Sequence, residues 1–328
     1  MAELSTRQPD AWEAMGAAAM EHCAVDFGHH IDYLEQSLRF GDEGIFAHYL
    51  TWLEEFFRGM GWSDSTLSLT LDCIEAALRR SMPAVQSDVA IGFLDTSRHD
   101  SGSRASKETT LLPAPGPHAA EFLRLLLSGN HRAAGEQALG LVEEGMDIRR
   151  LYIDVFQASQ RELGRLWLDG RIGVAQEHFC TAATQAIMSR LYPRIFSVPR
   201  VGRRLVAAAV GDELHEIGVR MVADFFELEG WDSVFLGANT PAKAIAATIE
   251  KEDAELLCLS ATMLVHIPRL TETIATVRSS CPPVRIMVGG YPFNLFPDLW
   301  KKVGADAFAR DAQEAVATAL AGSKRVAV

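Results

Sequence analysis

The stretch that decides the fold is Arg204-Leu-Val-Ala-Ala-Ala-Val-Gly-Asp-Glu-Leu-His-Glu-Ile-Gly218. The apolar run from Leu205 to Val210 predicts a buried strand, and the turn after it carries one imidazole, His215, before a helix begins. In an open α/β sheet, such a turn lies at the carboxyl edge, where ligands bind. Glu213 stands two residues earlier, where a carboxylate orients a metal-ligating histidine from behind. The pattern indicates one axial metal ligand, and Gly218 leaves room for a large flat cofactor.

Short apolar segments alternate with helical segments downstream of this stretch. Such alternation predicts a parallel sheet with helices on both faces. Five strands suit the flavodoxin-like order, whose ligand crevice lies between the first and third strands. We therefore predict a flavodoxin-like five-stranded domain over 203–328. Its predicted strands are 205–210, 232–236, 256–262, 285–289 and 305–308.

The chain upstream of this domain has helical periodicity and divides into three parts. Residues 1–94 predict an all-helical N-terminal domain with an aromatic stripe in 45–57. Residues 95–117 are rich in Ser, Thr, Gly, Pro and charge, and predict a linker. A four-helix bundle is predicted over 118–200, so the fold class is multidomain, α and α/β. Its helices are predicted at 118–128, 131–144, 147–169 and 173–194.

Composition excludes several classes of function. The formal charge of −12 argues against nonspecific binding to DNA or to anionic membranes, which requires a basic face. The five cysteines are scattered without C-x-x-C spacing and predict reduced thiols. Residues 1–10 lack an apolar signal core, and no stretch approaches the roughly 20 apolar residues that cross a bilayer. We expect a cytoplasmic protein that binds neither a membrane nor nucleic acid directly.

Further polar and small residues fall at the ends of the predicted strands. The second strand ends in Leu236-Gly237, the third in Ser260-Ala-Thr262 and the fourth in Gly289-Gly290-Tyr291. Each feature alone is more often a turn or a helix cap. Their joint position on consecutive crossover turns favours a ligand crevice with His215 on one wall. The contacts expected from the first turn are Glu213, Leu214, Glu216, Ile217 and Gly218.

The motifs Glu213-Leu-His-Glu-Ile-Gly218, Ser260-Ala-Thr262 and Gly289-Gly290, in this order, resemble the cobalamin-binding domain family over about 203–325. The resemblance implies that His215 replaces the dimethylbenzimidazole base as lower cobalt ligand. It also implies that the displaced nucleotide tail fills a slot beside the serine and the glycines. Ser260 and the Glu213 carboxylate would complete a hydrogen-bonded relay behind His215. Methyl-transferring members usually carry Asp where this chain has Glu213.

In the predicted bundle, Trp167 is followed after nine residues by Glu177-His178. This spacing resembles light-sensing cobalamin proteins of the CarH and LitR type. The resemblance implies that Trp167 packs over the 5′-deoxyadenosyl group of adenosylcobalamin, and that Glu177 and His178 contact the same face. An aromatic slab would exclude water there, while Glu177 accepts hydrogen bonds from ribose or adenine. Taken alone, the same residues would indicate a bundle core and a helix cap.

Two departures limit this resemblance. Residues 1–90 lack the basic recognition helix of a winged-helix DNA-binding domain, so direct operator binding is not expected. Leu168 stands where CarH-type proteins carry a histidine that captures cobalt after light cleaves its bond to carbon. The resemblance therefore does not carry over a bis-histidine light state.

The N-terminal domain has three alternative functions. Its aromatic stripe predicts a core or a dimerisation face. Its layout resembles the photocobilins, in which biliverdin binds close to cobalamin, and no cysteine indicates covalent attachment. A third alternative is an interaction surface for a transcription factor, as in stand-alone cobalamin antirepressors. The cations available for two biliverdin propionates are Arg39, Arg58, Arg79, Arg80, His22, His29 and His30.

The sequence predicts a photoreceptor that binds adenosylcobalamin, with biliverdin as a non-covalent second chromophore, and that is not an enzyme. Light would cleave the cobalt–carbon bond, release the adenosyl group beneath Trp167, and change a homo-oligomer or the binding of a signalling protein. The alternative is a corrinoid protein that carries methyl groups for a methyltransferase system. Trp167 and the Glu177-His178 pair argue against it, since they would obstruct methyl transfer. A mutase is disfavoured because no substrate barrel is predicted.

Overall fold

The computed structural model describes residues 17–59, 61, 64–108 and 114–323. The chain forms two compact units. The first contains the residues up to Ala114 together with Arg161–Glu177, and the second contains Pro115–Gln160 together with the residues from His178 onward. Within the described ranges, no helix combines the length and apolar character needed to cross a membrane.

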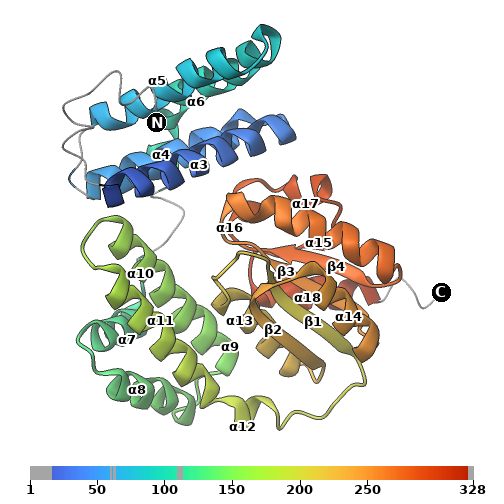
Figure 1. Ribbon diagram of the computed structural model, residues 1–328. Helices are drawn as coiled ribbons and strands as arrows, with labels where there is room; N and C mark the ends of the chain where they lie inside the picture. Colours follow the sequence, from blue (N-terminus) through green and yellow to red (C-terminus); the bar gives the residue numbers. More distant parts are fainter. Residues whose placement is uncertain (1–16, 60, 62–63, 109–113, 324–328) are drawn as a thin grey trace. The chain divides into compact units, whose positions relative to one another are not determined.

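The described residues in the N-terminal part of the first unit form helices (Figure 1). These are α3 (Ala17–Phe40), α4 (Glu43–Gly59), α5 (Asp64–Ser81) and α6 (Ala84–Glu108). Helix α4 packs against α3, α5 and α6, because its apolar residues recur at helical spacing. Much of the predicted aromatic stripe is therefore core. The buried members are Ile45, Phe46, Tyr49, Leu50, Leu53 and Phe57.

The predicted linker of 95–117 is wrong over its first part, because α6 continues to Glu108. The hydroxyl of Thr96 donates to the carbonyl of Gly92 (2.9 Å), and that of Ser97 donates to the carbonyl of Phe93 (2.7 Å). Such bonds to the preceding turn let hydroxyl residues remain in a helix. Polar composition alone was a poor signal for a chain break here. Residues 109–113 of the predicted linker lie outside the described residues.

The predicted bundle is divided between the two units. Arg161–Glu177, which holds most of α10 (Ala158–Leu168) and the start of α11 (Val174–Ser189), groups with α3–α6. A Cβ atom on Gly59 would lie 2.3 Å from the carbonyl oxygen of Leu168. The end of α4 therefore approaches the end of α10 more closely than any side chain would allow.

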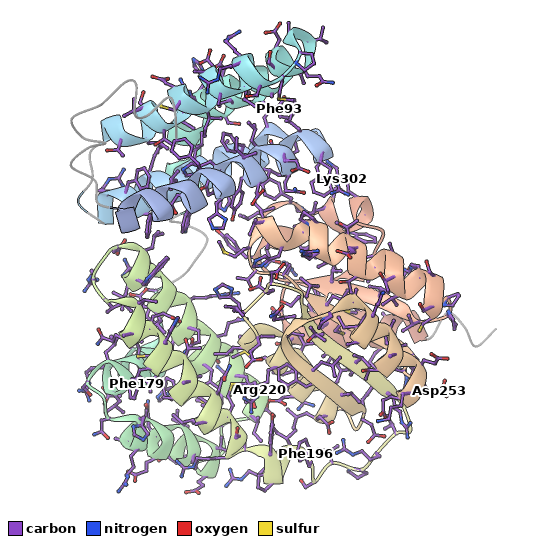
Figure 2. The ribbon with its side chains drawn as sticks, in the orientation of Figure 1. Phe93, Phe179, Phe196, Arg220, Asp253 and Lys302 are labelled. Carbon is purple, nitrogen blue, oxygen red and sulfur yellow. The ribbon has the colours of Figure 1, made fainter. Side chains whose placement is uncertain are left out.

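The remaining helices upstream of the sheet belong to the second unit. Tyr152 lies in a π-helical segment and donates a hydrogen bond of 2.7 Å to the buried Asp224 of α13 (Ile217–Glu227). Arg220, labelled in Figure 2, lies on the same helix. It donates to the Tyr192 hydroxyl at 2.9 Å and to Ser189 at 2.8 Å. These hydrogen bonds connect α13 to the π-helical segment and to the chain around Ser189 and Tyr192. The helices are α7 (Pro117–Leu127), α8 (His131–Glu143), α9 (Ile148–Arg150), η1 (Leu151–Gln157) and α12 (Tyr192–Ile195).

A five-stranded parallel sheet in the order β2-β1-β3-β4-β5 forms the centre of the second unit. This order confirms the predicted flavodoxin-like fold. Every residue of β1 from Leu205 to Val210 is buried, because β1 lies between two strands and beneath helices. The strands are β1 (Arg204–Val210), β2 (Asp232–Thr240), β3 (Leu256–Ser260), β4 (Arg285–Gly289) and β5 (Ala307–Phe308).

Helices cover the sheet in two pairs (Figure 1). Helix α13 packs against β1 and α18 (Ala312–Ser323), whereas α14 (Ala242–Glu252) packs against β1 and α15 (Ile267–Ser280). Because the strands are parallel, the crossover turns that follow β1, β3 and β4 lie at one edge of the sheet. The short elements at this edge are η2 (Leu264–His266), α16 (Tyr291–Leu295) and α17 (Leu299–Lys302).

Candidate metal centre

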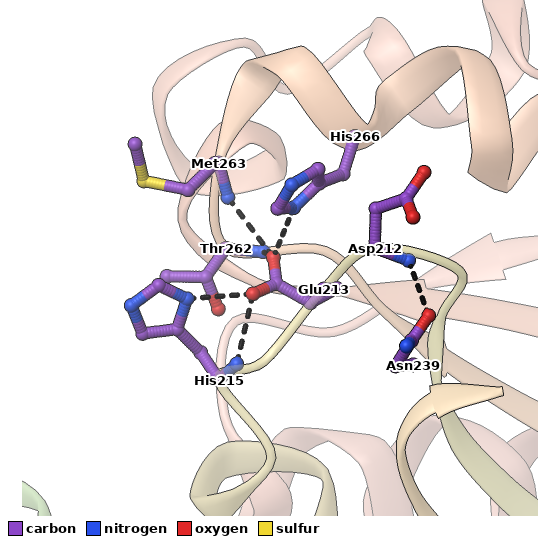
Figure 3. A network of polar contacts seen from close by, with 7 residues as sticks. All are labelled: Asp212, Glu213, His215, Asn239, Thr262, Met263 and His266. Atoms are coloured by element: carbon purple, nitrogen blue, oxygen red, sulfur yellow. Dashed lines mark hydrogen bonds and ion pairs between the residues drawn. The ribbon is translucent and has the colours of Figure 1, made fainter. Parts of the chain in front are cut away.

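The centre of the candidate site is the carboxylate of Glu213, which is fully buried (Figure 3). Its Oε1 accepts from the backbone N–H of His215 at 2.9 Å and from His215 Nδ1 at 2.6 Å. Its Oε2 accepts from the backbone N–H groups of Thr262 at 2.6 Å and Met263 at 3.2 Å, and from His266 Nδ1 at 2.9 Å. Five donors from two crossover turns therefore converge on one carboxylate.

The turn after β1 is held in shape by the end of β2. Asp212 has a positive φ of 68°, and its backbone N–H donates to the Asn239 side chain at 2.8 Å. The backbone N–H of Asn239 donates in return to the carbonyl of Glu213 at 2.8 Å. Because aspartate tolerates the left-handed region better than most residues, the chain reverses sharply here. This reversal directs the Glu213 side chain inward and leaves His215 at the surface.

Glu213 is ionised in the folded protein. Burial by itself raises the pKa of this carboxyl, but the hydrogen bonds from His215 and His266 outweigh burial and hold the pKa well below its usual range. An ionised carboxylate only accepts hydrogen bonds, so both imidazoles donate through Nδ1. The site therefore contains a fixed negative charge behind His215.

His215 has the geometry of an axial metal ligand. Its side chain is 61% exposed, while its Nδ1–H is engaged by Glu213. This contact fixes the tautomer, so Nε2 is the nitrogen through which this imidazole would bind a metal. A negative charge behind an imidazole also raises its basicity as a ligand. The donor set thus fits a metal that arrives with its other ligands and takes one nitrogen from the protein.

The residues around His215 leave space on one side of it. A Cβ atom added to Gly218 would meet no atom within 4 Å, and Leu214 is 71% exposed. Ile217 is half-buried at the start of α13. Because Leu214 is exposed and Gly218 has space around its backbone, this turn offers an apolar surface for a large flat ligand.

Glu216 and Gly237 are tied to each other within the protein. Glu216 accepts a hydrogen bond of 2.9 Å from Gln185 of α11 and another of 2.9 Å from the backbone N–H of Ala238. A Cβ atom on Gly237 would lie 3.0 Å from Glu216 Oε2. Both residues therefore support the turn after β1. Leu236, which precedes Gly237 on β2, is half-buried.

The implied relay through Ser260 is not formed. Among the residues that the structure describes, Glu213 accepts from Thr262, Met263 and His266 on the oxygen that faces away from His215, and from no serine. Ser260 is buried as the last residue of β3. Its position in the strand keeps it beside the cluster, while the following turn supplies the donors instead.

The two glycines at the end of β4 lie close to the backbone segments that follow β3 and β5. A Cβ atom on Gly290, which has a φ of 109°, would lie 2.0 Å from the carbonyl oxygen of Ala261. One on Gly289 would lie 3.3 Å from the carbonyl oxygen of Ala309. Tyr291 follows at the start of α16 and is 41% exposed. The pair was predicted to allow a ligand close to the backbone, whereas its immediate neighbours are other backbone segments.

The bundle residues predicted for the upper face belong to different parts of the chain. Trp167 is half-buried on α10 in the first unit, where its ring lies 5.6 Å from that of Phe56. Glu177 is half-buried and ends the first unit's segment, and the exposed His178 begins that of the second. The structure thus groups Trp167 with the N-terminal helices, and it brings His215, Glu213 and Thr262 together at the sheet edge.

His266 was not predicted as a site residue. It lies in the η2 turn after β3 and shares the carboxylate of Glu213 with His215. A second histidine four residues after Thr262, on the same predicted edge, was the available signal. Asn239 was also missed, since its role is to fix the backbone of Asp212.

Known families match two stretches of the chain downstream of the N-terminal helices. Residues 203–320 match a family described as B12 binding domain, and residues 119–192 match a second family with the same description. The chain therefore contains a cobalamin-binding module. The N-terminal helices lie outside both matches.

Individual relatives agree with this assignment. The chain is 27% identical to the HTH-type transcriptional repressor CarA of Myxococcus xanthus over 120 residues, which are 37% of this chain and 41% of the repressor. It is 27% identical to dimethylamine corrinoid protein 1 of Methanosarcina acetivorans over 169 residues, which are 49% of this chain and 77% of that protein. The Methanosarcina barkeri monomethylamine corrinoid protein has the same fold, with a TM-score of 0.55, 20% identity, and coverage of 61% of this chain and 95% of that one.

Proposed function

Because residues 119–192 and 203–320 each match a B12 binding domain, we propose that the chain holds a corrinoid through His215 and carries a methyl group on it for a partner methyltransferase. The observation that carries the proposal is the 2.6 Å contact between His215 Nδ1 and Glu213 Oε1. This contact presents one oriented imidazole at the ligand edge of the sheet. The bound corrinoid would supply a cobalt atom that accepts and releases the methyl group.

The comparisons support methyl carriage better than light reception. The dimethylamine corrinoid protein is matched over 77% of its length, whereas the CarA repressor is matched over 41%. In such a carrier, the residues of this chain bind and orient the corrinoid. His215 would hold the corrinoid through its imidazole, Glu213 would keep that ring oriented, and Leu214 and Gly218 would contact the flat ligand.

A light receptor that binds adenosylcobalamin is a second candidate, and Trp167 favours it. Trp167 groups with a helical domain that lies outside both B12-binding matches. A carrier of methyl groups does not require an N-terminal helical domain in contact with Trp167, whereas a receptor would use one. In the second candidate, Trp167 would exclude water from the adenosyl group and Glu177 would bind that group, so its loss would change a homo-oligomer or a signalling contact.

Biliverdin binding, as part of this second candidate, would use the N-terminal helices. They border an open cleft of about 390 Å³ whose charged lining residues are Glu54, Arg58 and Arg98, a volume in the range of small-molecule sites. Arg98 pairs with Asp72 at 2.9 Å, so Arg58 is the cation that this proposal assigns to a propionate. His30 cannot assist as a cation, because burial and the nearby His29 lower its pKa to about 4. His22 lies outside the residues whose side chains are described.

The decisive experiment compares dark binding of methylcobalamin, adenosylcobalamin and hydroxocobalamin by the full chain. Binding in which the spectrum shows histidine in place of the nucleotide base, lost in His215→Ala, supports corrinoid ligation. Equal affinity for the methyl and adenosyl forms, with methyl transfer from the methylcobalamin-loaded protein to a thiolate acceptor in the presence of a corrinoid methyltransferase, supports carriage. Preference for the adenosyl form, lost in Trp167→Ala, together with a change in elution volume under green light, supports the receptor. Absence of corrinoid binding contradicts both candidates.

A further inference from the structure

We infer that His266 is the outer member of a relay His215–Glu213–His266, in the place that the family resemblance assigns to Ser260. The inference deepens the proposed corrinoid ligation by His215 and rests on it. His266 is a positioning residue, because it acts on the metal ligand through a carboxylate.

The two oxygens of Glu213 divide the cluster into an inner and an outer side. Within the described part of the chain, Oε1 accepts from His215 alone, through its backbone N–H and its ring. Oε2 serves the turn after β3, through two backbone N–H groups and the ring of His266. Because Glu213 is fully buried, each of its lone pairs must find a donor inside the protein. The outer donors therefore determine where the inner oxygen can lie.

Local sequence explains why an imidazole reaches this oxygen. After β3 the chain makes a single 3₁₀ turn, Leu264–His266, and α15 then begins with Pro268 in its first turn. The backbone N–H groups of Thr262 and Met263 already point at Oε2. His266 caps α15 and returns its side chain toward the same point, where it is 16% exposed. Its long, planar side chain spans a gap that a hydroxyl on β3 does not bridge.

The role of His266 follows from this placement. Removing it would leave Oε2 with two backbone donors and would open the buried carboxylate to water. Glu213 would then rotate more readily, and His215 would lose part of the orientation that ligation needs. Removal of such an outer partner typically lowers metal affinity by about 10- to 100-fold. We expect His266→Leu to raise the corrinoid dissociation constant by a factor in this range.

The apo-protein provides a first test that does not depend on corrinoid binding. Two hydrogen-bonded imidazole Nδ1–H protons, from His215 and His266, should give downfield proton NMR signals with ¹⁵N-histidine labelling. Glu213→Gln should move both signals, and His266→Leu should remove one. Ser260→Ala should leave both in place. Loss of the signals in Ser260→Ala, with no change in His266→Leu, overturns the relay.

The second test measures hydroxocobalamin binding by absorbance in the dark. His266→Gln, whose amide retains a donor, should fall between wild type and His266→Leu. His131→Leu is the matched control, because His131 is an exposed histidine at the start of α8. Wild-type affinity in His266→Leu, with His215 still required, refutes the relay and leaves the proposed function standing. NMR signals as expected without any corrinoid binding refute the proposed function and leave the relay standing.

Discussion

The ring of Trp167 lies against that of Phe56, with centroids 5.6 Å apart and an interplanar angle of 35°. Phe56 in turn stacks on Trp52 at 5.4 Å, and Trp52 on Tyr49 at 6.1 Å. A continuous row of aromatic rings thus runs along α4 to the tryptophan of α10. Trp167, the residue predicted to cover a ligand, is thus attached to the N-terminal helices through aromatic contacts. Movement of Trp167 would disturb this row of rings.

Phe56→Ala should loosen Trp167. We expect a red-shifted tryptophan emission. We also expect a loss of about 1–3 kcal/mol in unfolding free energy, which is less than the loss for a fully buried phenylalanine because Phe56 is half-buried. Fluorescence and thermal melting measure both effects. Phe179→Ala is the control, since Phe179 is 40% exposed on α11. An unchanged emission in Phe56→Ala contradicts the attachment.

Glu213→Gln should weaken corrinoid binding while the imidazole of His215 remains present. An amide retains one acceptor oxygen but removes the negative charge behind the ligand, and its NH₂ group faces other donors. We expect the dissociation constant to rise by about 10- to 100-fold. Isothermal titration with hydroxocobalamin measures the change. His215→Ala should cost more, and a smaller effect for His215→Ala than for Glu213→Gln would argue against His215 as the ligand.

Gly290→Ala and Gly218→Ala should have opposite consequences. At Gly290 the new Cβ would collide with the carbonyl of Ala261 in a backbone conformation with positive φ, so we expect a loss of about 2–4 kcal/mol in stability. At Gly218 the Cβ enters open space, so stability should hold or rise slightly. Corrinoid affinity should fall in Gly218→Ala, if a flat ligand lies close to this backbone. Urea unfolding and cobalamin titration of both variants separate the two effects.

The pKa of about 4 for His30 predicts acid sensitivity of the N-terminal helices. In the unfolded chain this imidazole protonates near pH 6.5, so the unfolded state binds more protons between pH 6.5 and 4. The stabilisation is present above pH 6.5 and is lost as pH falls through about 4, by about 3 kcal/mol in total. His30→Gln should flatten melting temperature against pH in this window. His131→Gln, which alters an exposed ring at the start of α8, should retain the wild-type slope.

Asp224 should show the opposite pH dependence. Burial raises its pKa to about 6, so the folded state binds more protons than the unfolded state between pH 4 and 6. Its favourable contribution is present below pH 4 and is lost as pH rises through about 6. Asp224→Asn should therefore stabilise the protein at pH 8 by about 1–3 kcal/mol, and less at pH 4. Tyr152→Phe should destabilise it at pH 8, because the buried carboxylate loses the hydroxyl at 2.7 Å. Equal effects of Asp224→Asn at both pH values contradict this assignment.

The sequence predicted most of the sheet, but less of the helical part of the chain that precedes it. The strand Leu205–Val210 is visible in the sequence because burial on both faces demands an unbroken apolar run. The end of the N-terminal helices was misplaced, since Thr96 and Ser97 satisfy their hydroxyls within α6 and do not interrupt it. The division of the predicted bundle between two units was also not predicted, because periodicity shows that a helix has an apolar face without showing which neighbour covers it.

The sequence by itself determined the pairing of Glu213 with His215, because the two residues are two positions apart and their contact follows from one turn. It also determined the parallel strand order, through the alternation of strands and helices. Only the tertiary structure decided what completes the site. The outer oxygen of Glu213 is satisfied by His266, 53 positions away, and Gly290 is required by the backbone of Ala261. A buried carboxylate takes whichever donors the fold places near it, and that choice depends on distances between segments that a linear pattern does not contain.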